Sequence, residues 1–241
     1  MESGSKRAEA IPAGGLAIVV GSSGGIGRAL LDRLAAQAMF AAALGLGRNS
    51  SPALDLTDEA SIAEASLHVR GIEADVRLVI DATGFLHDDE SSPEKSWRDL
   101  DAGHMAKAFA VNAIGPALVM KHFLPLLPRE GRSVFATLSA RVGSIGDNRL
   151  GGWYSYRASK AALNQLVRTA AIELGRTRPT ALCIALHPGT VATRLSAPFA
   201  KSGLEVQTAE QAADRLLDTI GRLRPGSSGG FFDHRGETVP W

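Results

Sequence analysis

Residues 16–31 read Leu16-Ala17-Ile18-Val19-Val20-Gly21-Ser22-Ser23-Gly24-Gly25-Ile26-Gly27-Arg28-Ala29-Leu30-Leu31, an apolar run followed by a glycine-rich loop and then by helical periodicity. A short continuous apolar run is typical of a strand buried on both faces of a sheet. Glycines let the backbone approach phosphate oxygens, and the free N–H groups at a helix N-terminus favour negative charge. The order strand, glycine loop, helix therefore predicts a pyrophosphate-binding turn, although its spacing is Gly21-x3-Gly25-x-Gly27 rather than G-x-G-x-x-G.

Apolar runs and helical periodicity continue through the rest of the chain. With the run at 16–20, they predict about seven strands, the others being 41–46, 53–56, 76–82, 133–138, 180–186 and 229–232. Helices are predicted after the glycine loop and at about 58–69, 100–127, 156–175 and 208–223. Because strands and helices alternate without a repeat, we expect one α/β domain over 14–241, a Rossmann-type doubly wound parallel sheet with helices on both faces. Residues 1–13 are polar and small and are expected to form a loose leader.

Pro116 interrupts the helix predicted over 100–127. Proline removes a backbone donor, so a distortion of the helix is expected nearby. Asn112, one turn earlier, could pair with a carbonyl that this distortion frees. A buried polar side chain at that position needs such a partner.

The composition is that of a globular protein, with 241 residues of which 45% are hydrophobic and 21% charged. A formal charge of +1 with scattered Lys and Arg predicts neither a nucleic-acid nor an anionic-membrane partner. Cys183, the one cysteine, lies in an apolar run and is expected to be a buried thiol in a reducing compartment. The polar N-terminus and the lack of a run of about 18 apolar residues predict a cytoplasmic protein. The six histidines show no metal-ligand spacing, so no metal site is expected.

The predicted second strand ends in Gly47-Arg48-Asn49. At this place in a dinucleotide fold an acidic residue binds the ribose hydroxyls of NAD, whereas an arginine pairs with the 2′-phosphate of NADP. Arg48 therefore indicates NADP, unless it is a solvated surface arginine, and Arg28 could be a second cation for the phosphate. Asp55 could accept a hydrogen bond from the adenine amine or simply cap its turn.

Tyr156 and Lys160 lie at i and i+4 of a predicted helix and so share one face. A tyrosine hydroxyl has a reference pKa of about 10, and a nearby ammonium stabilises phenolate and lowers that pKa. The two side chains can therefore act as an acid–base pair. The pattern Y-x-x-x-K also arises by chance on solvated helices, so it indicates catalysis only together with a cofactor site.

Taken together, these residues resemble the short-chain dehydrogenase/reductase family from Leu16 to Trp241. The motifs that carry the resemblance are the glycine loop, Asp55, Asn112, a serine after the fifth strand, Tyr156-x3-Lys160 and Pro188-Gly189. The stretch from Val142 to Lys160 and the Pro240-Trp241 ending resemble, more narrowly, the C-factor-like and sniffer-like carbonyl reductases.

Two positions depart from the family pattern. Asp81-Ala82-Thr83-Gly84 stands where the family commonly has Asn-Asn-Ala-Gly, so the hydrogen bonding at Asp81 must differ. The family serine is usually the second of a Ser-Ser pair, a place that Ala140 occupies here. Ser139 or Ser144 must then serve, with Ser139 favoured because it directly ends the strand.

The resemblance implies hydride transfer between NADP(H) and a small carbonyl or alcohol substrate, with NADP(H) favoured over NAD(H). Tyr156 would exchange the proton, Lys160 would hold the nicotinamide ribose, Ser139 or Ser144 would orient the carbonyl, and Asn112 would hold a water. The implied cofactor-binding residues are Gly21, Ser23, Gly25, Ile26, Gly27, Arg48, Asp55, Leu56, Ala82, Gly84, Tyr156, Lys160, Pro188, Gly189, Val191 and Thr193.

The substrate wall is expected from Phe85-Leu86-His87, the 144–154 loop and residues 195–199, and it suggests a partly apolar pocket. Family members usually assemble through the helices at 104–124 and 157–174, so a homodimer or homotetramer is expected. A nucleotide-binding regulatory or signalling protein with little turnover is the alternative, since one fold serves many functions. Consumption of NADPH distinguishes the two.

Overall fold

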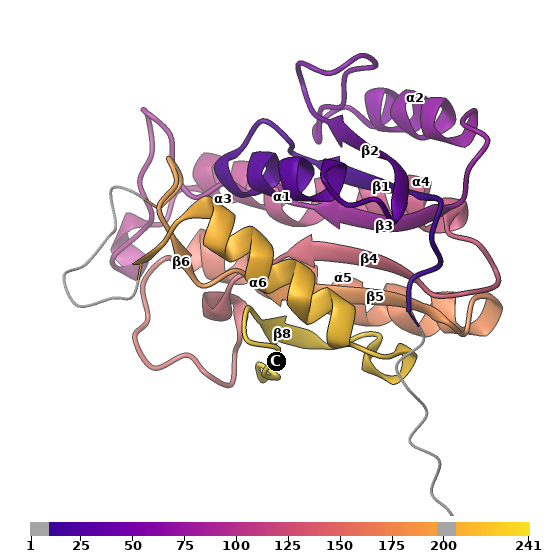
Figure 1. The fold of residues 1–241 in the computed structure, drawn as a ribbon. Coiled ribbons are helices and arrows are strands. Elements are labelled where there is room, and N and C mark those ends of the chain that lie inside the picture. Colours follow the sequence, from indigo (N-terminus) through magenta and orange to yellow (C-terminus); the bar gives the residue numbers. More distant parts are fainter. Residues whose placement is uncertain (1–9, 197–205) are drawn as a thin grey trace, which may run out of the picture.

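A computed structural model describes residues 10–196 and 206–241 as an α/β fold around a parallel sheet with the strand order β2-β1-β3-β4-β5-β8 (Figure 1). The strands are β1 (Gly15–Val20), β2 (Phe40–Leu46), β3 (Val76–Asp81), β4 (Ser133–Leu138), β5 (Ala181–His187) and β8 (Phe231–Asp233). Two short strands, β6 (Thr190–Val191) and β7 (Val206–Gln207), pair with each other outside this sheet. The predicted doubly wound parallel sheet is confirmed, with six strands in the described part of the chain.

Helices cover both faces of the sheet. The helices are α1 (Gly25–Ala35), α2 (Glu59–Arg70), α3 (Ala102–Phe109), α4 (Gly115–Phe123), α5 (Tyr154–Thr177) and α6 (Ala209–Arg222). In β1, Ala17 and Val19 pack toward α1 and α6, whereas Ile18 and Val20 pack toward α2, α4 and α5. This alternation follows from the two-residue period of a strand, and it explains why the strands read as unbroken apolar runs.

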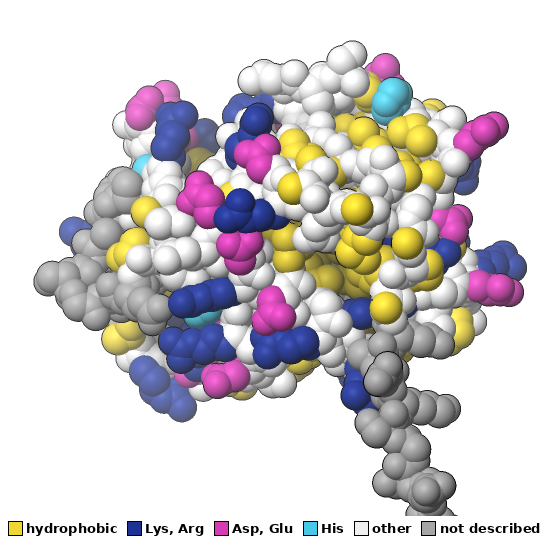
Figure 2. Space-filling model, in the orientation of Figure 1, with side chains coloured by type: hydrophobic (Ala, Val, Ile, Leu, Met, Phe, Trp, Pro, Cys, Tyr) yellow, Lys and Arg dark blue, Asp and Glu magenta, His cyan; other side chains and the backbone are white. Residues whose placement is uncertain are grey.

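The strand predicted at 53–56 is wrong, because these residues form an irregular turn. Side chains satisfy the backbone there: Ser50 Oγ donates to Pro52 O at 2.7 Å, and Asp55 Oδ1 accepts from Thr57 N at 2.8 Å. Such local bonds compete with a strand ladder. As a result β2 is an edge strand with small apolar residues, and an apolar area lies over this edge in Figure 2.

The helical region around Pro116 is broken as predicted, with a π-helical turn, Ala110–Ile114, between α3 and α4. The predicted partner of Asn112 is wrong, because its amide pairs with the backbone of Phe85 rather than with a freed helix carbonyl. A 3₁₀ turn, Leu124–Leu126, follows α4, and others lie at Trp97–Asp99, Arg141–Gly143 and Pro225–Ser227. Residues 102–126 have the length and composition of a membrane span. An 18-residue window within them has a mean hydropathy of 1.3, and 39% of this window is buried inside the protein.

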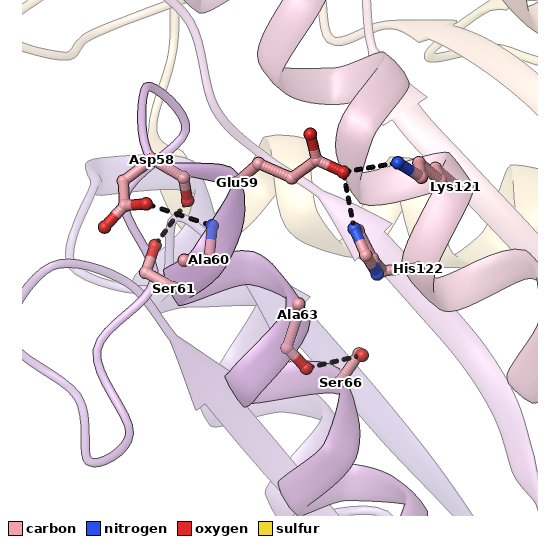
Figure 3. Close-up of polar contacts among 8 residues, drawn as sticks. All are labelled: Asp58, Glu59, Ala60, Ser61, Ala63, Ser66, Lys121 and His122. Carbon is pink, nitrogen blue, oxygen red and sulfur yellow. Dashed lines mark hydrogen bonds and ion pairs between the residues drawn. The ribbon is translucent and has the colours of Figure 1, made fainter.

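Helix α2 begins at Glu59 after its N-cap Asp58, close to the predicted start, and is tied to α4 (Figure 3). The Asp58 carboxylate accepts a hydrogen bond from Ala60 N at 3.0 Å, which satisfies one of the free donors of the first turn. Glu59 then accepts from Lys121 Nζ at 2.5 Å and contacts His122 Nε2 at 3.1 Å.

On the face drawn in Figure 2, cationic and anionic side chains are interspersed, in keeping with the formal charge of +1.

Candidate active site

The candidate site lies outside the carboxyl ends of β1 and β3, where the strand order reverses. The strand that follows β1 in the chain lies on one side of it, and β3 lies on the other. Ligands of doubly wound sheets bind at this switch point. Gly21, directly after β1, has φ +80°, and a Cβ there would lie 2.9 Å from Thr83 Cγ2. The loops after the two strands therefore meet closely.

The glycine loop forms an open backbone cradle. The N-cap of α1 is Gly24, which has no side chain to bind the free backbone N–H groups in the first turn of the helix. A Cβ on Gly25 would lie 3.1 Å from Thr193 Cγ2, and a Cβ would therefore narrow the space between α1 and the 190–196 segment. Backbone donors, a helix N-terminus and a space without side chains are what a pyrophosphate requires, so these residues fit a dinucleotide.

Gly27→Ala is expected to lower the free energy of unfolding by about 1–3 kcal/mol and to weaken NADPH binding. A Cβ at this position would lie 2.2 Å from Gly21 O, so the loop must shift. Thermal unfolding and NADPH titration measure both effects. The control is Gly175→Ala in α5, where a Cβ meets nothing within 4 Å and alanine should add about 0.5–1 kcal/mol of stability. Unchanged stability and affinity in Gly27→Ala would contradict the close packing.

The end of β2 is attached to the glycine loop, since Gly21 N donates to Leu46 O at 2.8 Å. This bond brings exposed Arg48 to the same end of the crevice. The Asp55 carboxylate caps its own turn by binding both N and Oγ1 of Thr57. Leu56 lies against α4, because a Cβ on Gly115 would be 2.7 Å from Leu56 Cβ.

Lys160 and Asn112 converge on Gly84. A Cβ on Gly84 would lie 3.7 Å from Lys160 Nζ and 3.8 Å from Asn112 Oδ1. Lys160 Nζ donates to Leu138 O at 2.7 Å, which places the ammonium at the end of β4. Asn112 accepts from Phe85 N at 2.7 Å and donates to Phe85 O at 2.8 Å. Three segments far apart in the chain thus meet around one glycine.

Burial controls the protonation of Tyr156 and Lys160. Removal from water raises the pKa of Tyr156 to about 12. Burial lowers the pKa of Lys160 to about 8, and the nearby Asp81 carboxylate opposes that decrease. The pKa of Tyr156 is therefore raised rather than lowered as expected, because desolvation of the phenolate dominates.

The two candidate serines differ in the hydrogen bonds that their hydroxyl groups form. Ser139 Oγ donates its proton to Asn164 Oδ1 at 2.6 Å. Ser144 Oγ accepts from Asp147 N at 3.1 Å, which leaves its own proton available to an acceptor. Ala140, which stands at the usual place of the family serine, packs in one buried cluster with Tyr156. The turn Arg141–Gly143, directly before Ser144, lies close to α5, since a Cβ on Gly143 would be 2.8 Å from Lys160 Cβ.

Asp81 is fully buried and pairs with neutral donors. Oδ1 accepts from Thr83 N at 3.1 Å and Thr83 Oγ1 at 2.5 Å, and Oδ2 accepts from Thr137 Oγ1 at 2.8 Å. These bonds connect the end of β3 to β4, as the altered sequence required. Sequence reasoning missed Thr137 and Asn164, because a polar residue in or beside an apolar run carries no signal of its distant partner.

The wall beside Tyr156 is apolar. Leu86, Ala140 and Tyr156 form one buried cluster, with Val142, Trp153 and Leu195 packed against it. Leu86, Trp153 and Leu195 fall in the predicted wall, whereas Ala140 and Val142 were not predicted. The part of that wall at 197–199 lies outside the described residues. His87 Nε2 contacts Arg194 O at 3.3 Å and so links the 85–88 and 190–196 segments.

The segment after β5 turns at Gly189, whose φ is +80°. Gln207 Nε2 donates to Pro188 O at 3.2 Å, and Val191 pairs with Gln207 in the short sheet. Thr193 N donates to Ser196 Oγ at 3.2 Å. Thr193 lies against Gly25 of the glycine loop, and Pro188, Gly189 and Val191 precede it in the same segment. Within residues 10–196 and 206–241, no group of three His, Cys, Asp or Glu side chains could hold a metal ion.

Known proteins are similar to this chain over most of its length. A family model described as enoyl-(acyl carrier protein) reductase matches residues 8–221. The 1-hydroxy-2-glutathionyl-2-methyl-3-butene dehydrogenase of Rhodococcus sp. is 34% identical over 235 residues, 93% of this chain and 98% of that protein. The C-signal of Myxococcus xanthus is 39% identical over 144 residues, 59% of this chain and 82% of that protein. The NADPH-bound carbonyl reductase from chicken fatty liver shares the fold, with a TM-score of 0.82, 24% identity and coverage of 95% of this chain and 100% of that one.

Proposed function

Since this chain belongs to the short-chain dehydrogenase/reductase family of oxidoreductases, we propose that it interconverts a carbonyl and an alcohol by hydride transfer with NADP(H). The observation that carries the proposal is the approach of Lys160 Nζ and Asn112 Oδ1 to Gly84. Lys160 itself lies one turn of α5 after Tyr156. The glycine loop after β1, Gly84 after β3 and the pair of Tyr156 and Lys160 lie on the side of the sheet where the strands have their carboxyl ends. This combination is what reduction of a carbonyl requires.

Tyr156 is the proton donor in the reducing direction. Its raised pKa keeps the hydroxyl protonated at neutral pH, which suits donation to a developing alkoxide. A nicotinamide cofactor, when bound here, would supply the hydride. The Lys160 ammonium stabilises the phenolate that remains and holds ribose hydroxyls, while Asn112 holds a water through which the proton is replaced. Gly84 keeps the space beside these groups free of side-chain atoms.

We assign Ser144, rather than Ser139, as the hydroxyl that orients the substrate carbonyl. Ser139 has its proton committed to Asn164, whereas Ser144 accepts a hydrogen bond and retains a free donor. A free donor is what stabilises negative charge on the carbonyl oxygen. Ser144 directly follows Gly143, which lies against Lys160, so its hydroxyl belongs to the same part of the site.

Arg48→Ala is expected to raise the NADPH dissociation constant about 10- to 100-fold and to leave that for NADH unchanged, because a charged hydrogen bond to the 2′-phosphate is worth about 1.5–3 kcal/mol. Fluorescence titration with both nucleotides measures this. Arg28→Ala is the matched control: Arg28 Nε already donates to Asp32 at 3.0 Å, so a smaller effect is expected. Equal losses for NADH and NADPH in Arg48→Ala would count against the assignment.

A panel of ketones, aldehydes and quinones, followed by the loss of NADPH absorbance, tests the function. Consumption of NADPH with at least one class supports an enzyme. The relative named C-signal makes a signalling role the second candidate, and a signalling protein would bind NADPH without consuming it. Binding without turnover across the whole panel would favour that alternative.

A further inference from the structure

We infer that Glu94 is a positioning residue that holds Trp153 against Tyr156 and so shapes an aromatic wall for the substrate. Glu94 comes from the segment between β3 and α3 and lies far from the catalytic helix in sequence. The inference rests on the proposed carbonyl reduction and adds a substrate class to it, namely carbonyl compounds that carry an aromatic or other flat apolar group.

Glu94 is a buried carboxylate, 3% exposed, that forms hydrogen bonds with the start of α5. Oε2 accepts from Ser155 N at 3.1 Å, and Oε1 accepts from Ser155 Oγ. Its backbone O accepts from Trp153 N at 2.5 Å. The N-cap residue of α5 provides no side-chain cap of its own. Glu94 therefore takes the place of the missing local cap, and its charge suits the positive end of the helix.

The residues just before α5 adopt left-handed backbone conformations. Gly151 has φ +62°, Gly152 has φ +65°, and Trp153 has φ +54°. Trp153 is the non-glycine residue with a positive φ among those described. A bulky side chain in this region costs about 1 kcal/mol or more and persists only when its surroundings enforce it.

Arg157 holds the same segment from its carbonyl side. Nε donates to Gly152 O at 2.9 Å, and Nη2 donates to Gly151 O at 3.1 Å. Nη1 reaches Val142 O at 3.2 Å. Glu94 thus accepts from Trp153 N through its backbone O and from Ser155 N through its carboxylate. Arg157 donates to the carbonyls of Gly151 and Gly152 on the other side. Together the two residues hold the backbone conformation of Trp153.

The result of this arrangement is the position of one indole ring. The Trp153 and Tyr156 rings lie edge to face, with centroids 6.2 Å apart at 71°. Trp153 also packs against the apolar cluster of Leu86, Ala140 and Tyr156. A flat apolar group beside the carbonyl carbon gains contact with such a wall, whereas a short aliphatic chain gains little.

The experiment compares Glu94→Ala, Glu94→Gln and Glu94→Asp with an exposed acid of the same segment in Glu90→Ala. Alanine leaves Ser155 N and Oγ without partners in a place where Ser155 is fully buried. Glutamine can accept from Ser155 N through its oxygen and donate to Ser155 Oγ through its amide, so it should rescue the function. Aspartate retracts the carboxylate and tests the same direction if Glu94→Ala does not fold.

The kinetic readout is KM for benzaldehyde relative to KM for propanal, with kcat and the NADPH dissociation constant measured in parallel. In Glu94→Ala the KM ratio should rise about tenfold, with NADPH affinity unchanged, and Glu94→Asp should change in the same direction. Glu94→Gln and Glu90→Ala should match the wild type. A KM ratio unchanged in both Glu94→Ala and Glu94→Asp overturns the inference.

A second readout does not depend on turnover. The chain has three tryptophans, so a Trp97→Phe/Trp241→Phe background isolates the fluorescence of Trp153. Glu94→Ala should make Trp153 more accessible to acrylamide, and Glu94→Gln should not. If the wild type reduces no carbonyl but this change occurs, the proposed function fails and the positioning role stands. Equal quenching in wild type, Glu94→Ala and Glu94→Asp overturns the positioning role itself.

Discussion

Tyr156→Phe is expected to lower kcat/KM for carbonyl reduction by about 10²- to 10⁴-fold, the range that a positioned general acid contributes. Phenylalanine keeps the ring that packs with Leu86 and Ala140, so the fold and the cofactor cradle are preserved. Only the proton donor is lost. NADPH affinity should remain that of the wild type, and steady-state kinetics with nucleotide titration measure both quantities.

The matched control is Tyr154→Phe, at the first residue of α5, which shares the helix but not the face of Lys160. This variant should keep most of its activity. Near-wild-type turnover in Tyr156→Phe would contradict the assignment, and so would loss of NADPH binding together with turnover. In that second case Tyr156 would have a structural role.

Lys160→Met is expected to lower kcat/KM about 10²-fold or more and to change how stability depends on pH. Methionine has a similar length and no charge, so it can fill the buried space that the Lys160 side chain occupies. In the wild type the pKa of Lys160 is 10.5 in the unfolded chain and about 8 in the folded protein, because burial penalises the ammonium. Between these pH values the unfolded state binds more protons than the native state.

By linkage, the stability of the wild type relative to Lys160→Met should rise as the pH increases from 8 to 10.5, by at most about 3 kcal/mol. Below pH 8 the difference should be constant. Urea unfolding of both proteins across this range provides the measurement, with Lys95→Met as an exposed control. A difference that does not vary with pH, or that falls as the pH rises, would show that Lys160 is not desolvated.

Sequence alone predicted the elements whose stabilising contacts are local or periodic. The apolar runs around Ile18, Val79 and Phe135 are buried strands because both faces of the sheet are covered. The helix starts predicted at about 58 and 208 are close to those observed, because Asp58 and Thr208 cap α2 and α6 within the first turn of each helix. The strand predicted at 53–56 failed because Asp55 and neighbouring serines satisfy the backbone locally, an outcome that strand propensity does not include.

The candidate site was predicted as a set of residues at strand ends, and its geometry was not. Tyr156, Lys160 and Asn112 were chosen from their pattern, yet the partner of Asn112 proved to be Phe85. The start of α5 was predicted two residues late, at Tyr156. Its cap is Glu94, which is distant in sequence and reads as part of a polar loop. Likewise, the burial that raises the pKa of Tyr156 depends on tertiary packing.

The most direct test of the proposed mechanism follows a labelled hydride. NADPH carrying deuterium at the transferable C4 position is incubated with the protein and an active carbonyl from the panel, and the product is examined by mass spectrometry. We predict an alcohol that carries one deuterium on the former carbonyl carbon, formed by the wild type and at a greatly reduced rate by Tyr156→Phe. An unlabelled alcohol, or labelled alcohol formed equally fast by both proteins, would contradict hydride transfer with Tyr156 as the proton donor.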